Sequence, residues 1–419
     1  MKLARARFFA ALGLLAVLCL TAPRLAAARP GTEKPKIRAV TALIRLDRAT
    51  YKAQIAEALV FLRRAKAEFE KAGFEVQTIR ITTQPFPEYT RDLSPAEAIQ
   101  FFRDYNALAV KEGFDASIGP AILGRQDDPR QAELLAKIIA ATTTLEGSIV
   151  IADDDGVNWT AVRAAASVIE YLAAHTPHSQ GNFDFSATAL VPAGTPFYPA
   201  SYYAGVGNQF AIGLQSANVV AEALGSARGD PDAAERAIKE SLGVWVAGVE
   251  TIGRRLADAT GWVYGGIDLS PAPLKDVSIA GAIERFTGAR MGSSGTLTAA
   301  AAITRALRAI PVAKVGYSGL MMPVLEDSVL SQRWSEGALS LDALLAYSSV
   351  CGTGLDVVPL PGDISHGQLE RILGDVATLA VKLHKPLSAR LLPVVGKKPG
   401  ERTEFDDPFL VNAVLQRLP

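Results

Sequence analysis

Strand-like and helix-like stretches alternate along most of the chain. The segment 36–46, KIRAVTALIRL, is apolar enough for a buried strand, and the next segment carries apolar residues at helical spacing from Tyr51 until Gly73. The segment 75–82, EVQTIRIT, alternates apolar and polar residues as a strand does. This order is typical of α/β proteins whose parallel sheets are covered by helices.

The same alternation continues to the C-terminus. Helices are predicted at about 95–112, 131–142, 158–175, 231–260 and 367–386, and strands at about 114–120, 147–152 and 387–396. The stretch from Gly181 begins as a strand and becomes a loop rich in aromatic residues and proline. Because no short repeat and no low-complexity linker interrupts this pattern, we predict one large α/β domain over residues 36–419, with 177–181 as its only plausible break.

The first thirty residues follow a different pattern. Basic residues within the first seven positions precede an apolar stretch from Phe8 to Leu20, which is followed by the small residues Ala26–Ala28. This is typical of an export signal peptide, predicted here as residues 1–28, so we expect a periplasmic or extracellular protein. A retained anchor is the alternative, but the apolar run is shorter than the ~20 residues that span a bilayer, so we expect no stable membrane span after cleavage.

Composition narrows the function classes. The chain has 43 basic and 43 acidic residues, so its net charge gives no reason to expect nucleic acid as a partner. Hydrophobic residues make up 49% of the chain, which is sufficient for a large core. Cleavage after the leader would remove Cys19 and leave Cys351 as the single cysteine, so no intrachain disulfide is expected.

Cys351 is the first candidate for chemistry. It lies in YSSVCGTGLDVVPLPGD, where Gly352 and Gly354 could form a turn that presents the thiol. A nucleophilic thiol needs an electropositive setting, and the nearest histidine in sequence is His366. The alternative is that Cys351 is a small buried apolar residue, as free cysteines commonly are.

Several carboxylates lie beside turns rich in glycine or proline. Asp356, Glu326 and Asp268 are candidate acid or base groups. Asp356 and Asp363 together are a candidate site for a divalent metal, although their spacing matches no zinc motif. The alternative for Asp363 is a helix cap or a turn.

A glycine- and serine-rich loop precedes a predicted alanine-rich helix. Its backbone N–H groups and hydroxyls could bind a phosphate or carboxylate of a substrate. The candidate anion-binding residues are Gly292, Ser293, Ser294, Gly295 and Thr296, together with Arg390 in the last strand. The loop is not a Walker A motif, because no Lys-Ser/Thr follows the glycines, and ordinary helix capping is the alternative.

Six stretches carry a resemblance to a known family. They are GNFDFSATALVPAGTPFYPASY, GGIDLSPAPLKDVSIAGAIE, GSSGT, SGLMMPVLEDSVLSQR, YSSVCGTGLDVVPLPGD and KPLSARLLPVVGKKPGERTEFDDPFL. From about Lys36 to the C-terminus the chain resembles the domain of unknown function 711 family, also called uncharacterised protein family 0210. This resemblance implies a ten-stranded α/β barrel of the pyruvate formate-lyase and ribonucleotide-reductase type, with two parallel half-sheets around a finger loop.

The resemblance also suggests a place for Cys351, because radical enzymes of this architecture carry a cysteine at the tip of the finger loop. The partner glycyl-radical motif is absent: AKVGYSGL around Gly316 echoes it only superficially, and nothing similar follows Arg390. Glycyl radicals are installed in the cytosol and destroyed by oxygen, so an exported protein is not expected to contain one. The cofactor is otherwise undetermined, with a divalent metal as one candidate.

We therefore predict a non-radical enzyme, lyase- or hydrolase-like, that acts on a small anionic metabolite. Cys351 would be its nucleophile or its acid and base, assisted by the neighbouring carboxylates. A non-catalytic protein that binds a small metabolite or a divalent metal is the alternative, and a homo-oligomer is compatible with either function.

Overall fold

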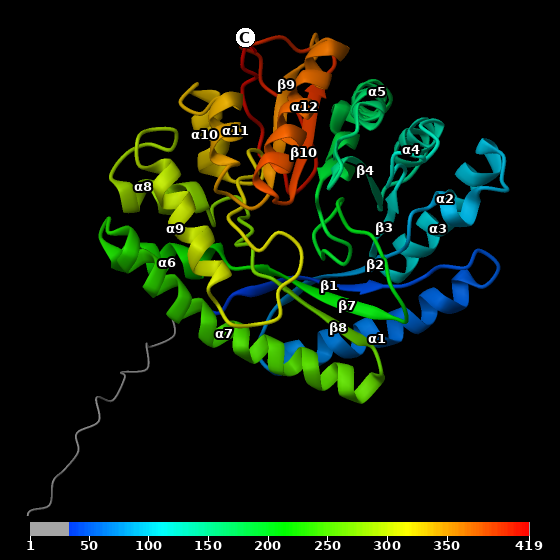
Figure 1. Cartoon of the computed structure of the whole chain (residues 1–419), viewed down its shortest axis with the longest axis horizontal. Coiled ribbons are helices and arrows are strands. Elements are labelled where there is room, and N and C mark those ends of the chain that lie inside the picture. Colours follow the sequence, from blue (N-terminus) through cyan, green and yellow to red (C-terminus); the bar gives the residue numbers. More distant parts are fainter. Residues whose placement is uncertain (1–32, 419) are drawn as a thin grey trace, which may run out of the picture.

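The computed structural model describes residues 33–418, and the predicted leader lies outside this range. Ten strands form one sheet in the order β8-β7-β1-β2-β3-β4-β6-β10-β9, with the short β5 paired to β4 (Figure 1). The strands are β1 (Lys36–Leu43), β2 (Val76–Thr82), β3 (Asp115–Pro120), β4 (Leu145–Asp153), β5 (Gly156–Val157), β6 (Phe185–Ala189), β7 (Gln209–Gln215), β8 (Val263–Asp268), β9 (Gly354–Pro361) and β10 (Leu387–Val394). The predicted α/β class is confirmed.

The sheet contains one parallel block with a pair of oppositely directed strands on each side. Strands β1, β2, β3, β4 and β6 are parallel to one another. Strand β7 is antiparallel to β1 and parallel to β8, and β10 is antiparallel to β6 and parallel to β9. Hydrophobic periodicity predicted the parallel block but not the two antiparallel junctions.

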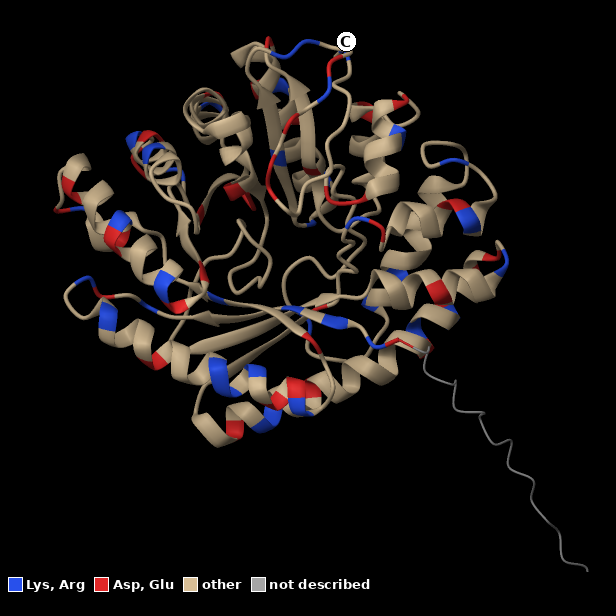
Figure 2. Cartoon of the chain, turned by 180° about the vertical axis from the view of Figure 1, so that it is seen from behind, with Lys and Arg blue, Asp and Glu red and all other residues tan. Residues whose placement is uncertain are grey.

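Helices cover the outer face of the strongly curved sheet, and loops occupy its inner side (Figure 1). The helices are α1 (Tyr51–Lys71), α2 (Pro87–Thr90), α3 (Pro95–Glu112), α4 (Arg130–Ala140), α5 (Trp159–His175), the 3-10 helix η1 (Pro177–Asp184), α6 (Ala217–Ala227), α7 (Pro231–Thr260), α8 (Ile279–Thr287), α9 (Thr296–Arg308), α10 (Ser328–Ser335), α11 (Leu341–Tyr347) and α12 (His366–Leu383). Among the described helices, none has both the length and the apolar character needed to cross a bilayer. Basic and acidic residues are interspersed along the outer helices (Figure 2).

The long helices begin and end where local chemistry requires it. Ser94 and Glu97 form a capping box at the start of α3, and Gly113 ends that helix in the left-handed conformation. Asp230 caps α7, which ends before Gly261 in the same way. The bounds predicted for these two helices are confirmed.

The two faces of the strands differ in polarity. In β2, Ile79 and Ile81 pack in the hydrophobic core under the helices, whereas Thr78 and Arg80 line a cavity on the inner side. Side chains of a strand alternate between the two faces of the sheet, and polar positions of β1, β2, β3, β4, β6, β9 and β10 reach the same inner space. The curved sheet therefore has an apolar outer face and a polar inner face.

Two loop segments occupy the inner side of the sheet: the aromatic loop, residues 190–208 between β6 and β7, and a second inner segment, residues 309–327 between α9 and α10. In the aromatic loop after β6, Tyr198 accepts a hydrogen bond from Thr82 at 2.9 Å. The carbonyl of Ser201 in the same loop accepts one from Ser117 at 2.7 Å. These contacts fix the loop against β2 and β3.

The second inner segment lies between the two edge strands. It forms an isolated bridge to β8 at Lys314 and another to β9 at Pro323. Strands β8 and β9 end the hydrogen-bonded strand order without pairing to each other. Closure into a barrel of the pyruvate formate-lyase type therefore stays a prediction.

Candidate functional site

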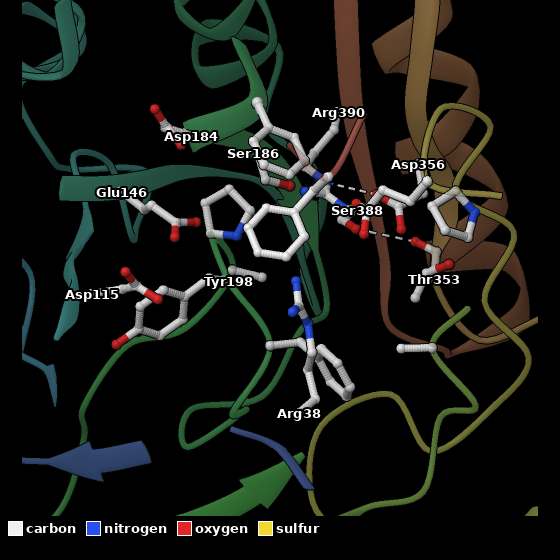
Figure 3. A pocket seen from close by; sticks show the side chains of 18 of the residues that line it. Arg38, Asp115, Glu146, Asp184, Ser186, Tyr198, Thr353, Asp356, Ser388 and Arg390 are labelled. Atoms are coloured by element: carbon white, nitrogen blue, oxygen red, sulfur yellow. Dashed lines mark hydrogen bonds and ion pairs between the residues drawn. The ribbon is translucent and has the colours of Figure 1, made fainter. Parts of the chain in front are cut away.

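A charged cavity of about 180 Å³ lies on the inner side of the sheet (Figure 3). Its walls come mainly from the first residues of the parallel strands, from β9 and β10, and from the aromatic loop. The charged lining residues are Arg38, Arg80, Asp115, Glu146, Asp184, Glu326, Asp356, Arg390 and Asp407. The lining contains three guanidinium groups and six carboxyl groups, far more charge than a cavity needs for packing alone.

Among the described residues, two guanidinium groups in this cavity donate no hydrogen bond to a carboxylate. Arg38 forms one long hydrogen bond, 3.4 Å to Gln77, and stacks 4.7 Å from the ring of Phe409. Arg80 is buried, donates to Thr78 at 3.1 Å and lies 3.7 Å from the carboxylate of Asp115. Burial and the charge of Arg80 lower the pKa of Arg38. Both groups therefore keep donors for an anionic ligand.

Three carboxyl groups gather on another side of the cavity. Asp115, Glu146 and Asp184 stand together there (Figure 3), and among the described residues neither Glu146 nor Asp184 has a hydrogen-bond or ion-pair partner. Burial and the charge of Asp184 raise the pKa of Glu146 well above its usual range. Burial, with the charge of Asp407, raises the pKa of Asp184 to about 8. Such groups hold a proton near neutral pH and can give it up or take it back.

The third guanidinium group is fully paired. Arg390 donates to Asp356 at 2.6 Å and to Glu326 at 2.7 Å, and its guanidinium lies 5.1 Å from the ring of Phe183. Burial raises the pKa of Glu326, while the charge of Arg390 opposes that shift. The structure thus brings together three residues that the sequence predicted separately.

The remaining contacts shape the cavity. Tyr198 stacks its ring 4.6 Å from the Arg80 guanidinium, and its hydroxyl is held by Thr82. Asp407 and Phe409 reach the cavity from the C-terminal segment, where the backbone N–H of Val411 donates to the carbonyl of Leu325 at 2.7 Å. Asp115, whose side chain is 39% exposed, lies where solvent enters.

Cys351 lies elsewhere. It is fully buried in the hydrophobic core and is not among the cavity-lining residues. Its carbonyl, with that of Ser348, accepts hydrogen bonds from the ammonium group of Lys385. A side chain on Gly352 would come within 2.7 Å of the backbone of Gly319, so the glycine after Cys351 is explained by close approach of two loops. A catalytic role for Cys351 stays a prediction that this cavity does not support.

Asp268 is an anchor for the second inner segment. Its fully buried carboxylate accepts hydrogen bonds from the backbone of Tyr317 at 2.7 Å and of Ser318 at 2.9 Å. It also accepts bonds from the backbone and the hydroxyl of Ser270 at 3.0 and 2.7 Å. Burial raises the pKa of Asp268, and these four donors oppose the shift. Asp268 does not line the cavity, so its position indicates a structural role.

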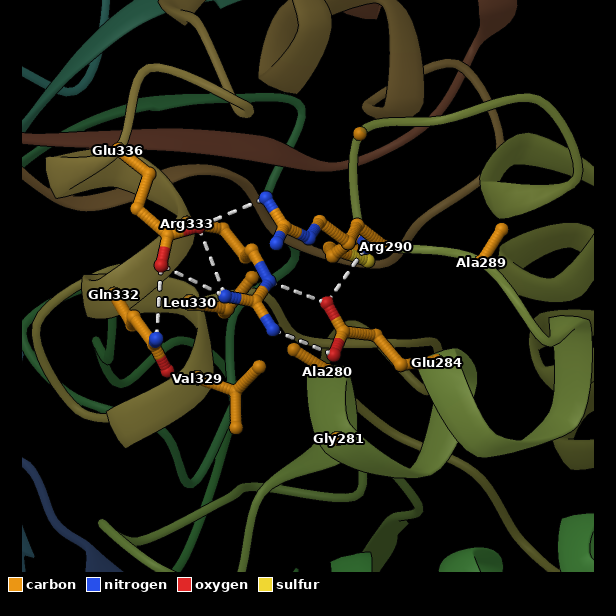
Figure 4. A network of polar contacts seen from close by, with 12 residues as sticks. Ala280, Gly281, Glu284, Ala289, Arg290, Val329, Leu330, Gln332, Arg333 and Glu336 are labelled. Atoms are coloured by element: carbon orange, nitrogen blue, oxygen red, sulfur yellow. Dashed lines mark hydrogen bonds and ion pairs between the residues drawn. The ribbon is translucent and has the colours of Figure 1, made fainter.

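The predicted anion-binding loop, Gly292–Thr296, joins α8 to α9 and contributes nothing to the cavity lining. It adjoins a partly buried ion-pair network (Figure 4), in which Arg333 donates to Glu284 at 2.6 and 2.9 Å. Glu284 in turn accepts a bond from the backbone of Met291 at 2.8 Å. These contacts hold the loop in place, and of the predicted anion-binding residues only Arg390 lies in the cavity.

The predicted metal pair is separated by the length of a strand. Asp356 lies in the cavity at the start of β9, whereas Asp363 is exposed in the turn after the same strand. A strand rises about 3.3 Å per residue, so the two carboxylates are roughly 20 Å apart and cannot share an ion. Within residues 33–418, no group of three or more His, Cys, Asp or Glu side chains is arranged to hold a metal.

The sequence interpretation did not identify the strongest part of the site. Arg38, Arg80, Asp115, Glu146 and Asp184 were not singled out. The sequence nevertheless contained a signal for these residues. Strands of a parallel sheet covered on both faces are normally continuous apolar runs, whereas these strands carry charged residues within them or directly before them. A charged residue at the start of several successive strands indicates a shared polar space.

Comparison with known proteins agrees with the resemblance seen in the sequence. A family model described as Uncharacterised ACR (DUF711) matches residues 31–406. A UPF0210 protein of Pyrobaculum arsenaticum is 32% identical over 350 residues, covering 79% of this chain and 76% of the relative. One of Desulforudis audaxviator is 33% identical over 354 residues, covering 80% and 77%. One of Listeria monocytogenes is 26% identical over 350 residues, covering 80% and 77%.

The family model spans residues 31–406, and each of these relatives covers about four fifths of the chain. The chain therefore belongs to the uncharacterised DUF711, or UPF0210, family.

Proposed function

We propose that the protein is an enzyme that binds a small anionic molecule in the charged cavity and moves a proton on it. Arg38 and Arg80 bind the anionic group, and the carboxyl pair Glu146 and Asp184 acts as general acid and base. One observation carries this proposal: two guanidinium groups that donate no hydrogen bond to a carboxylate share the cavity with two carboxyl groups that have no hydrogen-bond or ion-pair partner among the described residues. The reaction would be of the lyase or hydrolase class.

The arrangement suits binding and proton transfer for separate reasons. Guanidinium groups bind carboxylate and phosphate oxygens through paired N–H donors, and Arg80 is already held in place by Thr78 and the ring of Tyr198. A carboxyl group with a pKa near 8 is protonated in about nine tenths of the molecules at pH 7, which suits a general acid. The Arg390, Asp356 and Glu326 group would set the local charge and not react.

A non-catalytic binding protein is the second candidate, and the composition of the lining favours it. The cavity-lining residues include no histidine, lysine or cysteine, which are common nucleophiles and proton carriers in enzymes. Ser186, Thr353 and Ser388 supply hydroxyls there, but no base is hydrogen-bonded to them as a serine nucleophile requires. The two candidates differ in whether the bound molecule is converted.

We also propose export after cleavage of the leader and a barrel closed by the second inner segment. The basic and apolar pattern of residues 1–28 supports export. The bridges from Lys314 to β8 and from Pro323 to β9 support closure, because one segment reaches both edges of the sheet.

The binding step is tested by thermal-shift measurements on the purified protein with a panel of small carboxylates, hydroxy acids, amino acids and inorganic phosphate. We expect at least one of these anions to raise the melting temperature by several degrees at millimolar concentration. Arg80→Gln should abolish that shift, because it removes the charge and keeps the length of the side chain. Conversion of the same compound is then followed by proton NMR.

Arg63→Gln is the matched control. Arg63 is an exposed arginine of α1 paired with Glu112, outside the cavity, and its variant should keep the full shift. Equal shifts in Arg80→Gln and in the wild type would refute the anion site. A compound that binds through Arg80 but is never converted would refute the proposed catalytic role and favour a non-catalytic binding protein.

A further inference from the structure

We infer that the molecule bound in this cavity carries a protonated amine as well as its anionic group, so that its class is an amino acid or a close zwitterionic relative. This inference rests on the proposed function and adds the ligand class to it. It assigns Asp115, Glu146 and Asp184 the binding of the ammonium group and leaves the anionic group to Arg38 and Arg80.

The first support is the separation of the two charge types along the sheet. Arg38 and Arg80 belong to β1 and β2, whereas Asp115, Glu146 and Asp184 precede or begin β3, β4 and β6, which follow in that order. Neighbouring strands lie about 4.8 Å apart, so basic and acidic groups succeed one another across a distance that a small molecule can bridge. A ligand with one charge of each sign matches this order.

The second support is the balance of charge. Arg390 is matched by Asp356 and Glu326 through direct ion pairs, which leaves two guanidinium groups facing four further carboxyl groups. A purely anionic ligand would satisfy Arg38 and Arg80 but would supply no hydrogen-bond donor to the unpartnered carboxyl groups of Glu146 and Asp184. An ammonium group supplies three donors to those carboxyl oxygens, and its positive charge compensates their ionisation.

The third support is the protonation of the empty site. The charged groups that face Glu146 and Asp184 are Arg80 on β2, Asp115 on β3, Arg390 on β10 and Asp407 in the C-terminal segment. In the absence of ligand, protons neutralise the crowded carboxyl groups. An ammonium ion bound there takes over that neutralisation, so binding should release protons into solution.

The size of the cavity limits the ligand. A volume of about 180 Å³ is below the roughly 300–1,000 Å³ typical of cofactor and drug sites, which suits a small molecule such as an amino acid.

The test is isothermal titration of the purified protein with compounds matched in length. For each chain length from two to six carbons, the dicarboxylate, the ω-amino acid, the α-amino acid and the diamine are compared. At one length we expect an amino acid to bind at least tenfold more tightly than the dicarboxylate and the diamine. Titration at pH 7 in buffers of different ionisation enthalpy should show release of up to about one proton per bound amino acid.

Variants of the carboxyl groups separate the ligand class from the anion site. Glu146→Gln should weaken amino-acid binding at least tenfold and leave dicarboxylate binding equal or stronger, and Asp184→Asn is the second variant if the first fails to fold. Glu133→Gln, an exposed glutamate of α4 outside the cavity, should change neither affinity.

Two results would overturn the inference. If a dicarboxylate binds as tightly as the amino acids at every length and Arg80→Gln abolishes its binding, the ligand class is wrong while the anion site of the proposed function stands. If no compound of either type binds at millimolar concentration, both the ligand class and the anion site are refuted.

Discussion

At the scale of single residues, Cys351 and its glycines are explained by packing. The thiol is fully buried in the core, and Gly352 lies where its backbone N–H donates to the carbonyl of Leu320 at 2.6 Å. The close approach of Gly319 excludes a side chain at Gly352. A thiol flanked by glycines suggested a catalytic turn because the sequence does not show what the turn packs against.

This explanation predicts the behaviour of two substitutions at Cys351. Cys351→Ala should lower the free energy of unfolding by about 1–2 kcal/mol, because it leaves a small void in the core. Cys351→Ser should cost about 1–3 kcal/mol, because its hydroxyl would be buried among apolar neighbours. Denaturant unfolding measures both effects, and ligand binding in the cavity should be unchanged. Complete loss of binding or turnover in a folded Cys351→Ala protein would restore the thiol as a catalytic group.

At the scale of elements, Asp327 joins two helices through one buried carboxylate. It caps α10 by accepting hydrogen bonds from the backbone of Val329 and Leu330 at 3.0 and 3.1 Å. It also accepts bonds from the start of α8, at 2.5 Å from the Ser278 hydroxyl and 2.8 Å from the Ile279 backbone. The starts of the two helices, distant in sequence, therefore depend on the same side chain.

We predict that Asp327→Ala lowers the free energy of unfolding by about 2–4 kcal/mol, since it removes two caps and leaves buried N–H donors without acceptors. Asp230→Ala is the control, because Asp230 is an exposed cap of a single helix, α7, and its loss should cost about 1 kcal/mol. Thermal unfolding of both variants measures the difference. Equal losses would contradict the double role of Asp327.

The elements could be predicted from sequence to a large extent, and the site only in part. Capping residues and apolar spacing predict α3 and α7 to the residue, because those signals are local. The antiparallel junctions and the cavity depend on which strands become neighbours, which no local pattern specifies. Asp356 and Arg390 were selected separately, and only the pairing of β9 with β10 brings them into contact.

At the scale of the whole molecule, the cavity links folding to pH. The pKa of Asp184 is raised to about 8 in the folded protein, mainly by burial, against about 4 in an unfolded chain. The folded state therefore binds the proton more tightly, and this contribution to stability is complete below about pH 4. It is lost progressively as the pH rises towards 8.

Asp184→Asn should remove this dependence, because the amide stays neutral. We predict that the free energy of unfolding of the variant rises relative to that of the wild type between pH 5 and pH 8, by up to about 1.4 kcal/mol for each pH unit. Chemical denaturation at both pH values measures the effect. A difference between the two proteins that is the same at both pH values would contradict it.

The proton transfer and the proton release on amine binding both depend on a carboxyl pair that holds a proton near neutral pH inside the empty cavity. The most direct measurement is a carbon-13 NMR titration of the aspartate carboxyl groups of the purified protein, with Asp184→Asn used to assign the signal. The account predicts that the Asp184 signal titrates with a midpoint near pH 8. A midpoint below pH 5 would mean that the pair is ionised in the empty cavity and would contradict the acid and base role assigned to it.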